Sequence, residues 1–335
     1  MKTLCTLFLT LAASSAALAT PSSSAALATP SDPSTSSTCA PGALGAARFL
    51  SAADYRQEFV PADATMVLHV DLKNLRNSTL GQVITKMRPE FEDDEMKEMI
   101  AKLGFDPLTE IDAITIYGSG QDEENFGAVL VASEAIDKAL EMLPEQEGYQ
   151  AVSKDGIDFF QFDGLVGSWH IMDSGERLVM VGKTIDIALR GHQVIHGDLP
   201  NQSQHKHASK GGPTPGSIVY FSGGGELLKQ AKGQIGSSIM EAVTGGQFEM
   251  SESDGYLKLS LGVQTGSREA AQDMRETLGG FMALGRMLIS NSDQIPAEAA
   301  GLLRSINLNV EGKNVAISLS VPVKDAMQIM HSIER

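Results

Sequence analysis

Four histidines in one short stretch are the side chains of this sequence best suited to chemistry. His192 and His196 are four residues apart, so on a helix they would share one face. The chain that follows could fold His205 or His207, together with Asp198, back toward that face. Imidazole and carboxylate groups are common ligands of zinc and copper. The segment therefore predicts a candidate metal site with His192, His196, His205 and His207 as its ligands.

A structural interpretation of the same segment stays open. Residues 197–216 are rich in Gly, Pro and His, which is typical of a polar connector between two folded modules. Metal-binding histidines usually stand on rigid elements, whereas this stretch predicts a mobile loop. Outside it, His69 and His170 are interpreted as structural histidines of strands. Trp169, the one tryptophan, is interpreted as an anchor of the core.

The familiar motifs of enzymes are missing from the chain. It contains no G-x-S-x-G, no H-E-x-x-H, no G-x-x-x-x-G-K-[ST] and no C-x-x-C. Their absence favours a protein that binds without catalysing a reaction. A hydrolase built on separate carboxylates stays open, because the linear sequence does not say which of the 42 Asp and Glu side chains meet.

The net negative charge of the chain disfavours two classes of binding partner. The formal net charge is −16 at neutral pH, with 26 Lys and Arg against 42 Asp and Glu. A chain this acidic is repelled by nucleic acid and by anionic membrane surfaces, so neither is expected as a partner. Of the two cysteines, Cys5 lies in the predicted leader. The thiol of Cys39 would then be free or pair with another molecule.

The N-terminus has the pattern of a secretory signal peptide. Lys2 supplies a positive start, residues 4–13 are apolar, and Ala17-Leu18-Ala19 is the small-x-small sequence that signal peptidase accepts. We predict residues 1–19 as the signal peptide, with an alternative end at residue 28. The chain is therefore expected to be exported, either to the periplasm or out of the cell.

A linker is predicted to follow the signal peptide. The letters SSAALATP occur at 14–21 and again at 23–30, which we interpret as a duplication at the end of the signal without chemistry of its own. Residues 20–48 are rich in Ser, Pro and Ala and are predicted to be disordered. No later stretch is long and apolar enough for a membrane helix.

The first predicted module spans residues 49–196. Hydrophobic runs bounded by turn residues predict its strands, and apolar residues recurring every three or four positions predict its helices. The expected strands are 65–72, 111–118, 126–132, 157–162, 168–172 and 177–182, and the expected helices are 80–87, 96–103, one begun by Ser133, and 184–195.

A second module, residues 217–335, is predicted after the connector with nearly the same order of elements. Its strands are expected at 217–221, 247–251, 256–265, 306–310 and 315–321, and its helices at 226–243, after Ser267, at Pro296 and after Pro322. The helix after Ser267 places Met274 and Phe281 on one apolar face. The shared order favours an internal duplication. We predict an α+β fold of two similar modules, each with a mostly antiparallel sheet and flanking helices.

The pattern resembles a group of uncharacterised exported bacterial proteins, frequent in planctomycete-like and other envelope-rich bacteria. The resemblance rests on FVPADATMVLHVDL (59–72), LGFDPLTEIDAITIYG (103–118), GAVLVA, YQAVSKDGIDFFQF and ERLVMVGKTIDIALRG. It covers most of the mature chain and implies export and a repeated α+β body. It brings no catalytic residue with it.

Two functions of different class follow from the sequence. The first is a non-catalytic binding or scaffold protein of the bacterial envelope, whose sheet surfaces contact another envelope protein or a polymer. The alternative is a metal-binding protein or metal-dependent hydrolase that uses zinc or copper at the His192 to His207 loop. Convergence of the histidines with Asp198 would favour the alternative.

Overall fold

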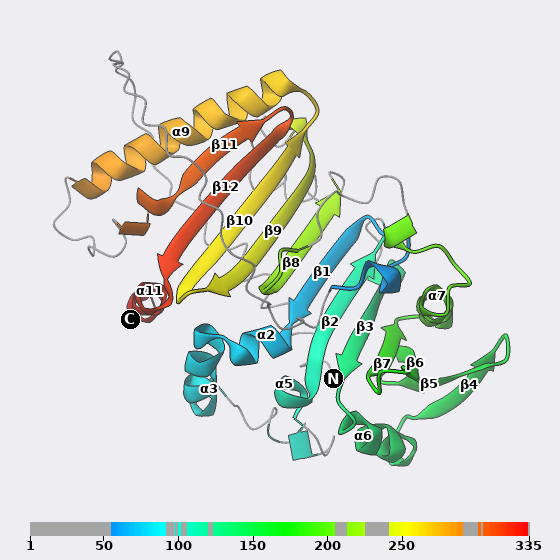
Figure 1. Cartoon of the computed structure of the whole chain (residues 1–335). Coiled ribbons are helices and arrows are strands. Elements are labelled where there is room, and N and C mark those ends of the chain that lie inside the picture. The colour runs from blue at the N-terminus through cyan, green and yellow to red at the C-terminus, as the bar shows by residue number, and fades with distance from the viewer. Residues whose placement is uncertain are drawn as a thin grey trace.

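The strands of the protein join into one large antiparallel sheet. The structure is a computed structural model that describes residues 55–91, 97, 100–101, 106–119, 123–204, 213–224, 241–290, 301–302 and 304–333. Within these residues the sheet has twelve strands in the order β11-β12-β10-β9-β8-β1-β2-β3-β7-β6-β5-β4 (Figure 1). The fold is therefore α+β, as predicted, with one continuous sheet at its centre.

The first half of the chain supplies seven strands and five of the helices in the described ranges. The strands are β1 (Met66–Asp71), β2 (Ile111–Gly118), β3 (Phe126–Ala132), β4 (Gln150–Lys154), β5 (Ile157–Phe162), β6 (Leu165–Ile171) and β7 (Arg177–Gly182). The helices are α2 (Leu72–Asn77), α3 (Thr79–Phe91), α5 (Pro107–Glu110), α6 (Ile136–Met142) and α7 (Ile185–Ile195).

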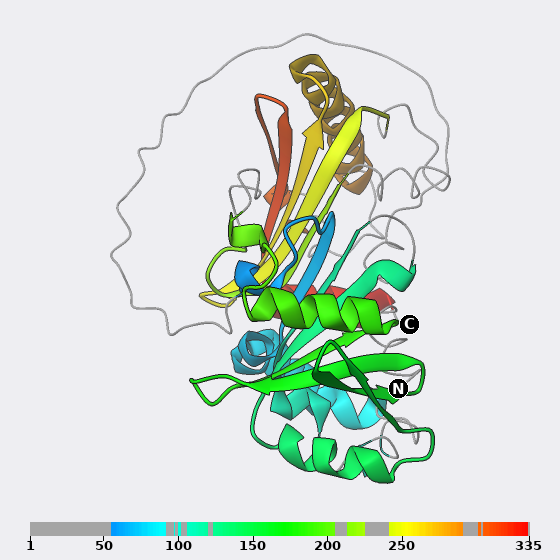
Figure 2. The ribbon, with the colours of Figure 1, turned by 90° about the vertical axis from the view of Figure 1, so that its right-hand side faces the viewer.

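The second half supplies the other five strands. These are β8 (Ser217–Gly224), β9 (Val243–Ser253), β10 (Tyr256–Thr265), β11 (Asn307–Glu311) and β12 (Asn314–Pro322), accompanied by the helices α9 (Arg268–Ser290) and α11 (Val323–Ile333). In Figure 2 these yellow to red elements stand above the green strands β4 to β7. The two halves meet at the centre of the sheet, where β8 pairs antiparallel with β1.

Asp-Gly pairs set three of the tight turns between strands. Asp155, Asp163 and Asp254 each adopt a positive φ and each precede a glycine that also has a positive φ. Two successive residues in this region form the hairpin turn whose twist matches that of the flanking strands. These turns fix the register of β4 with β5, of β5 with β6, and of β9 with β10.

Both faces of the sheet are covered in the first half of the chain. On one face Val67, Tyr117 and Met180 pack with Phe59 of the segment before β1, and α7 lies on this face because Gly191 closely approaches the Tyr117 ring. The other face packs against α2 and α6 through the cluster Leu72, Ile111, Ile114, Ala132, Ile136, Leu143, Phe160 and Val179. The strands here are therefore apolar on both sides.

Among the described residues, helices cover one face of the second half of the sheet, at its two ends. At one end Ala271 and Met274 of α9 pack with Val243 and Val315. At the other end Met327 of α11 packs with α3 and with side chains of β9 and β10. The opposite face of these strands carries exposed polar side chains, among them Gln247, Lys258, Ser260, Gln264, Asn309, Asn314, Ser318 and Ser320.

Most of the predicted elements in the described ranges are confirmed, with several differences. Strand β4 and the short helices α2 and α5 were not predicted, and β9 begins at Val243 instead of residue 247. The predicted helices 96–103 and 226–243 and the start at Pro296 lie largely outside the described residues. The interpretation of Trp169 as a core anchor is wrong, because its side chain is 46% exposed on the outer side of β6.

Candidate functional site

Three histidines gather where α7 ends beside β6. The rings of His192 and His196 lie with their centroids 4.3 Å apart, and the ring of His170 stands edge-on to His196 at 4.6 Å. The four-residue spacing on α7 brings the first two together, as predicted. His170 comes from β6, against which α7 packs. We call His170, His192 and His196 the histidine cluster.

The surroundings of His192 disfavour its protonation. Burial lowers the pKa of His192, and the neighbouring His196 and His170 lower it further, while Asp198 acts in the opposite direction. The Nδ1 atom of His192 is buried and has no hydrogen-bond partner among the described residues. The neutral form of His192 is therefore favoured over the charged form.

The predicted metal site is only partly within the described residues. His192 and His196 lie together, whereas His205 and His207 lie outside the described residues. The rings of His192 and His196 are inclined by 38°, in contact with one another. Among the described residues, no group of three or more His, Cys, Asp or Glu side chains is arranged to hold a metal ion.

The sequence did not predict that His170 lies beside His192 and His196. His170 is 22 positions before His192, so no local spacing connects the two. The strand position of His170 was predicted, but the face on which α7 packs was not. The alternation of polar and apolar residues along 168–171 was the only signal of its orientation. The partner of His170 is decided by the packing of α7 on the sheet.

Replacing His192 with Gln should weaken the pH dependence of stability in mildly acidic solution. The folded-state pKa of His192 lies below the ordinary value of 6.5, so the unfolded chain binds more protons as the pH falls through 6.5. The free energy of unfolding of the native protein should therefore decrease in this range. Urea unfolding at pH 7.5 and 5.5 should give a smaller decrease for His192→Gln. An equal decrease in both proteins would contradict the effect.

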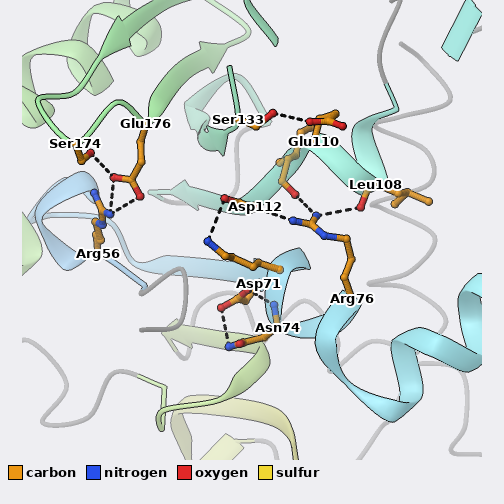
Figure 3. Close-up of polar contacts among 12 residues, drawn as sticks. Arg56, Asp71, Asn74, Arg76, Leu108, Glu110, Asp112, Ser133, Ser174 and Glu176 are labelled. Atoms are coloured by element: carbon orange, nitrogen blue, oxygen red, sulfur yellow. Dashed lines mark hydrogen bonds and ion pairs between the residues drawn. The ribbon is translucent and has the colours of Figure 1, made fainter. Parts of the chain in front are cut away.

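A second polar group joins α2 to α5 and the start of β2 (Figure 3). The Arg76 guanidinium donates to the carbonyl oxygens of Leu108 (3.0 Å) and Ile111 (2.6 Å), and to the Asp112 carboxylate (2.6 Å). Lys73 is 3.6 Å from the same carboxylate. The carbonyls that Arg76 binds are groups that a short helix leaves without partners. This arrangement stabilises the structure and leaves no donor directed to a ligand.

Arg76→Met should lower the free energy of unfolding by about 2–3 kcal/mol. The substitution keeps much of the aliphatic stem but removes three hydrogen bonds from a charged donor, each of which stabilises more than a neutral one. Lys73→Met is the matched control, because Lys73 is half exposed and its ion pair should contribute less than about 1 kcal/mol. Chemical unfolding of both variants measures the difference in the free energy of unfolding. An equal decrease in both variants would contradict a stabilising role of the Arg76 hydrogen bonds.

The segment before β1 is held by another charged pair and a buried polar group. Arg56 donates two hydrogen bonds to Glu176, at 2.7 and 2.9 Å (Figure 3). Burial alone would raise the pKa of Glu176, but the bonds from Arg56 and Ser174 lower it below its ordinary range. Nearby, the ring of Tyr55 lies edge-on to His69 at 5.5 Å.

His69 is a structural histidine, as predicted. Its side chain is buried, and its Nδ1 atom is hydrogen-bonded to the Thr115 hydroxyl at 2.9 Å. Tyr55 covers the ring and donates to the Gln202 side chain. Burial raises the pKa of the Tyr55 phenol above its ordinary value, with Tyr220 adding to the effect. The group is enclosed, which does not suit contact with a ligand.

The second half of α9 exposes large apolar side chains. Phe281, Leu284 and Met287 are 65%, 53% and 54% exposed. The helix packs on the sheet through Ala271 and Met274, near its start. The predicted apolar face is therefore buried at Ala271 and Met274 and exposed at Phe281, because among the described residues the sheet contacts the first half of the helix. Three exposed apolar side chains within seven residues form a patch of the kind that marks interaction sites.

No described helix is long and apolar enough to cross a membrane. The longest, α9, is interrupted by charged residues on its exposed side, including Arg275, Glu276 and Arg286.

The chain matches no protein-family model and no curated protein. It aligns with solved structures of TP0453, a spirochete protein. Crystal form III aligns with a TM-score of 0.43 and 12% identity over 82% of this chain and 97% of TP0453. Crystal form I has a TM-score of 0.43 and 11% identity over 82% and 96%, and crystal form IV has 0.44 and 13% over 82% and 95%.

Proposed function

We propose that this chain is an exported, non-catalytic binding or scaffold protein of the bacterial envelope. Its partner is another envelope protein or a polymer, and neither nucleic acid nor an anionic membrane surface fits the net charge of −16. The observation that carries the proposal is the exposed apolar stretch of α9. We call Phe281, Leu284 and Met287 the α9 patch.

The α9 patch supports binding because its exposure is costly in water. Burying a large apolar side chain stabilises a complex by about 1.5–3 kcal/mol. Eight large apolar side chains of the described residues are exposed, and three of them fall within seven residues of α9. Scattered apolar side chains are ordinary at a protein surface, whereas a contiguous group is not. The polar groups around β1 and α2, in contrast, satisfy one another.

Binding through the α9 patch is tested with the mature protein immobilised and exposed to a purified envelope fraction. Phe281→Glu with Leu284→Glu should remove the bound component, because two charges would have to be desolvated at the contact. Gln272→Glu, an exposed position of the covered half of α9, is the matched control. Equal capture by all three proteins would place the binding surface elsewhere.

Export is tested by fractionation of cells and N-terminal sequencing of the protein. Cleavage after Ala19 would give Thr20 as the first residue, and cleavage at the alternative site after Ala28 would give Thr29. An intact Met1 in a cytoplasmic fraction would contradict the proposal.

An internal duplication is also part of the proposal, and the strand order supports it. The order β1-β2-β3-β7-β6 of the first half corresponds to β8-β9-β10-β12-β11 of the second, with the hairpin β4–β5 as an addition. Both α6 and α9 follow the third strand of their half on the same face of the sheet. The closing helices differ, since α7 and α11 lie on opposite faces. An experimental structure in which these strand pairs do not superpose would contradict the duplication.

Metal binding is the second candidate, and the histidine cluster is the observation that favours it. The rings of His170, His192 and His196 lie close, but these described side chains are not arranged to hold a metal ion by themselves, so the candidate needs a further ligand such as His205 or His207. Zinc and copper titration calorimetry on the tag-free mature protein tests it. His170→Gln should weaken binding if the cluster provides the ligands, whereas His205→Gln with His207→Gln should weaken it if the following loop does. No binding by the native protein would remove this candidate.

A further inference from the structure

Among the described residues, the strand β11 forms one edge of the sheet and has main-chain groups without a partner strand. It pairs with β12 on one side and is the last strand in the order. The Val310 N–H is bonded to the side chain of Asn309 and therefore does not donate to β12. Main-chain groups alternate in direction along an antiparallel strand. Those of Leu308 and Val310 therefore point away from the sheet.

This edge has few of the features that protect exposed strands. Between Asn307 and Glu311 the strand has no proline, no lysine and no bulge, and its register with β12 is uninterrupted. The hydrogen bond from Val310 to Asn309 is the one local device in the strand that occupies an outward group. Such an edge is competent to accept another strand.

The first half of the sheet shows what fills the corresponding position. There the order β3-β7-β6 continues into β5, which pairs with the outer side of β6. The order β10-β12-β11 stops at β11. The second half therefore lacks, among the described residues, the strand that completes the first.

The α9 patch lies on the same side of the molecule as this edge. Leu308 and Val310 pack under the start of α9 with Met274. In Figure 1 the second half of α9 then extends past β11, which is the outermost strand at this end. A partner at the edge would thus meet both unpaired main-chain groups and exposed apolar side chains.

We propose that the chain forms a two-fold symmetric homodimer in which β11 of each copy pairs antiparallel with β11 of the other. The two α9 helices then lie antiparallel on the same face of the joined sheet, and each α9 patch, which extends past its own β11, faces the partner copy. The dimer names the partner of the surface used in the proposed function and rests on that proposal. A two-fold axis allows one surface to complement itself.

The charges of the strand fit this symmetry. With the axis at Asn309, Leu308 of one copy pairs with Val310 of the other, and Glu311 stands opposite Asn307. The strand pairing therefore places no like charges opposite one another. Four main-chain hydrogen bonds would form at the outward residues, two of them after Asn309 releases the two Val310 N–H groups.

Sedimentation velocity of the mature protein over a range of concentrations tests the proposal. The native protein should sediment as a dimer at micromolar concentration. Asn309→Lys should shift it to monomer, because two lysines would meet at the axis, and Phe281→Glu should do the same through the helices. Both side chains are exposed, so neither change should affect folding. Ser260→Lys, on the same exposed face but on β10, is the matched control and should remain dimeric.

A disulfide gives an independent test of the strand register. Asn309→Cys, in a chain with Cys39 replaced by Ser, should form a covalent dimer on mild oxidation, because directly opposite residues have Cα atoms about 4.5–5.5 Å apart. Gln264→Cys in the same background should give no disulfide-linked dimer on non-reducing electrophoresis, since β10 lies inside the sheet.

Three results would overturn the dimer. These are a native protein that is monomeric at tens of micromolar, a dimer that Asn309→Lys and Phe281→Glu leave intact, and a monomer whose α9 patch binds neutral phosphatidylcholine vesicles instead. The proposed function fails separately. An envelope partner captured by a monomeric native protein would keep the function and reject the dimer, whereas a dimer that captures no other protein or polymer would keep the α9 patch as a binding surface and restrict its partner to a second copy.

Discussion

Gly81→Ala should destabilise the protein by at least about 3 kcal/mol or prevent it from folding. Gly81 lies in the first turn of α3, directly after the turn that separates α3 from α2. A Cβ atom here would stand 2.6 Å from the carbonyl carbon of Leu75 and still closer to its oxygen. That group is backbone, which cannot rotate away as a side chain would. The α2–α3 junction would have to open to relieve this overpacking at a buried site, and the contacts of the junction would be lost.

Gly280→Ala is the matched control for this prediction. Gly280 also lies within a helix, but a Cβ atom there would meet nothing within 4 Å. Alanine is the better helix former, so this variant should be more stable by up to about 1 kcal/mol. Thermal and urea unfolding of both variants decide the matter. A Gly81→Ala variant as stable as the native protein would show that the close approach does not exist.

Asp71→Asn should remove much of the stability change between pH 4 and pH 7. Asp71 is 1% exposed at the end of β1, where its carboxylate accepts from the backbone N–H and the side-chain amide of Asn74. Burial raises its pKa from 3.8 to about 6, and the nearby Asp112 adds to this, while the backbone bond and the cations Lys73 and Arg76 act against it. The folded protein thus binds this proton more tightly than the unfolded chain does.

The sign and the size of the effect follow from this pKa. Between pH 3.8 and about 6 the folded state holds the proton that the unfolded state has lost, so the free energy of unfolding decreases as the pH rises. A shift of about 2 pKa units corresponds to about 3 kcal/mol. The cost of Asp71→Asn relative to the native protein should therefore be smaller by about this amount at pH 7 than at pH 4.

Urea unfolding at the two pH values measures this difference directly. The comparison between pH values cancels any constant cost of replacing the carboxylate, such as a lost bond to the Asn74 amide. Asp158→Asn, on the exposed side of β5, is the control and should change stability by no more than about 0.5 kcal/mol at either pH. A cost of Asp71→Asn that is the same at pH 4 and pH 7 would contradict a buried carboxylate of raised pKa.

Local patterns were sufficient to predict many of the elements. The apolar run at 65–72 became β1, the Asp-Gly pairs became turns, and Ser267 accepts a hydrogen bond from the Ala270 N–H at the start of α9. These features depend on residues within a few positions of one another. Backbone conformation and capping at this range are therefore readable in the sequence.

The exposure of particular side chains was not readable in the same way. Trp169 was interpreted as a core anchor and Phe281 was placed on an apolar helix face, yet both side chains are exposed. A pattern tells which residues share a face of a strand or helix, but a second element must be present to cover that face. Strand β6 and the second half of α9 extend beyond the elements that cover their neighbours.

The sequence by itself determined that the chain is acidic, lacks the common catalytic motifs and forms an α+β fold with His192 and His196 on one helical face. Only the tertiary structure decided that the strands of both halves join in one sheet, that His170 meets the other two histidines, and that β11 is an edge. The physical reason is the separation in sequence between the residues that interact. Periodicity and turn chemistry act between near neighbours in the chain, whereas strand order and the covering of a face arise from contacts between residues far apart in sequence.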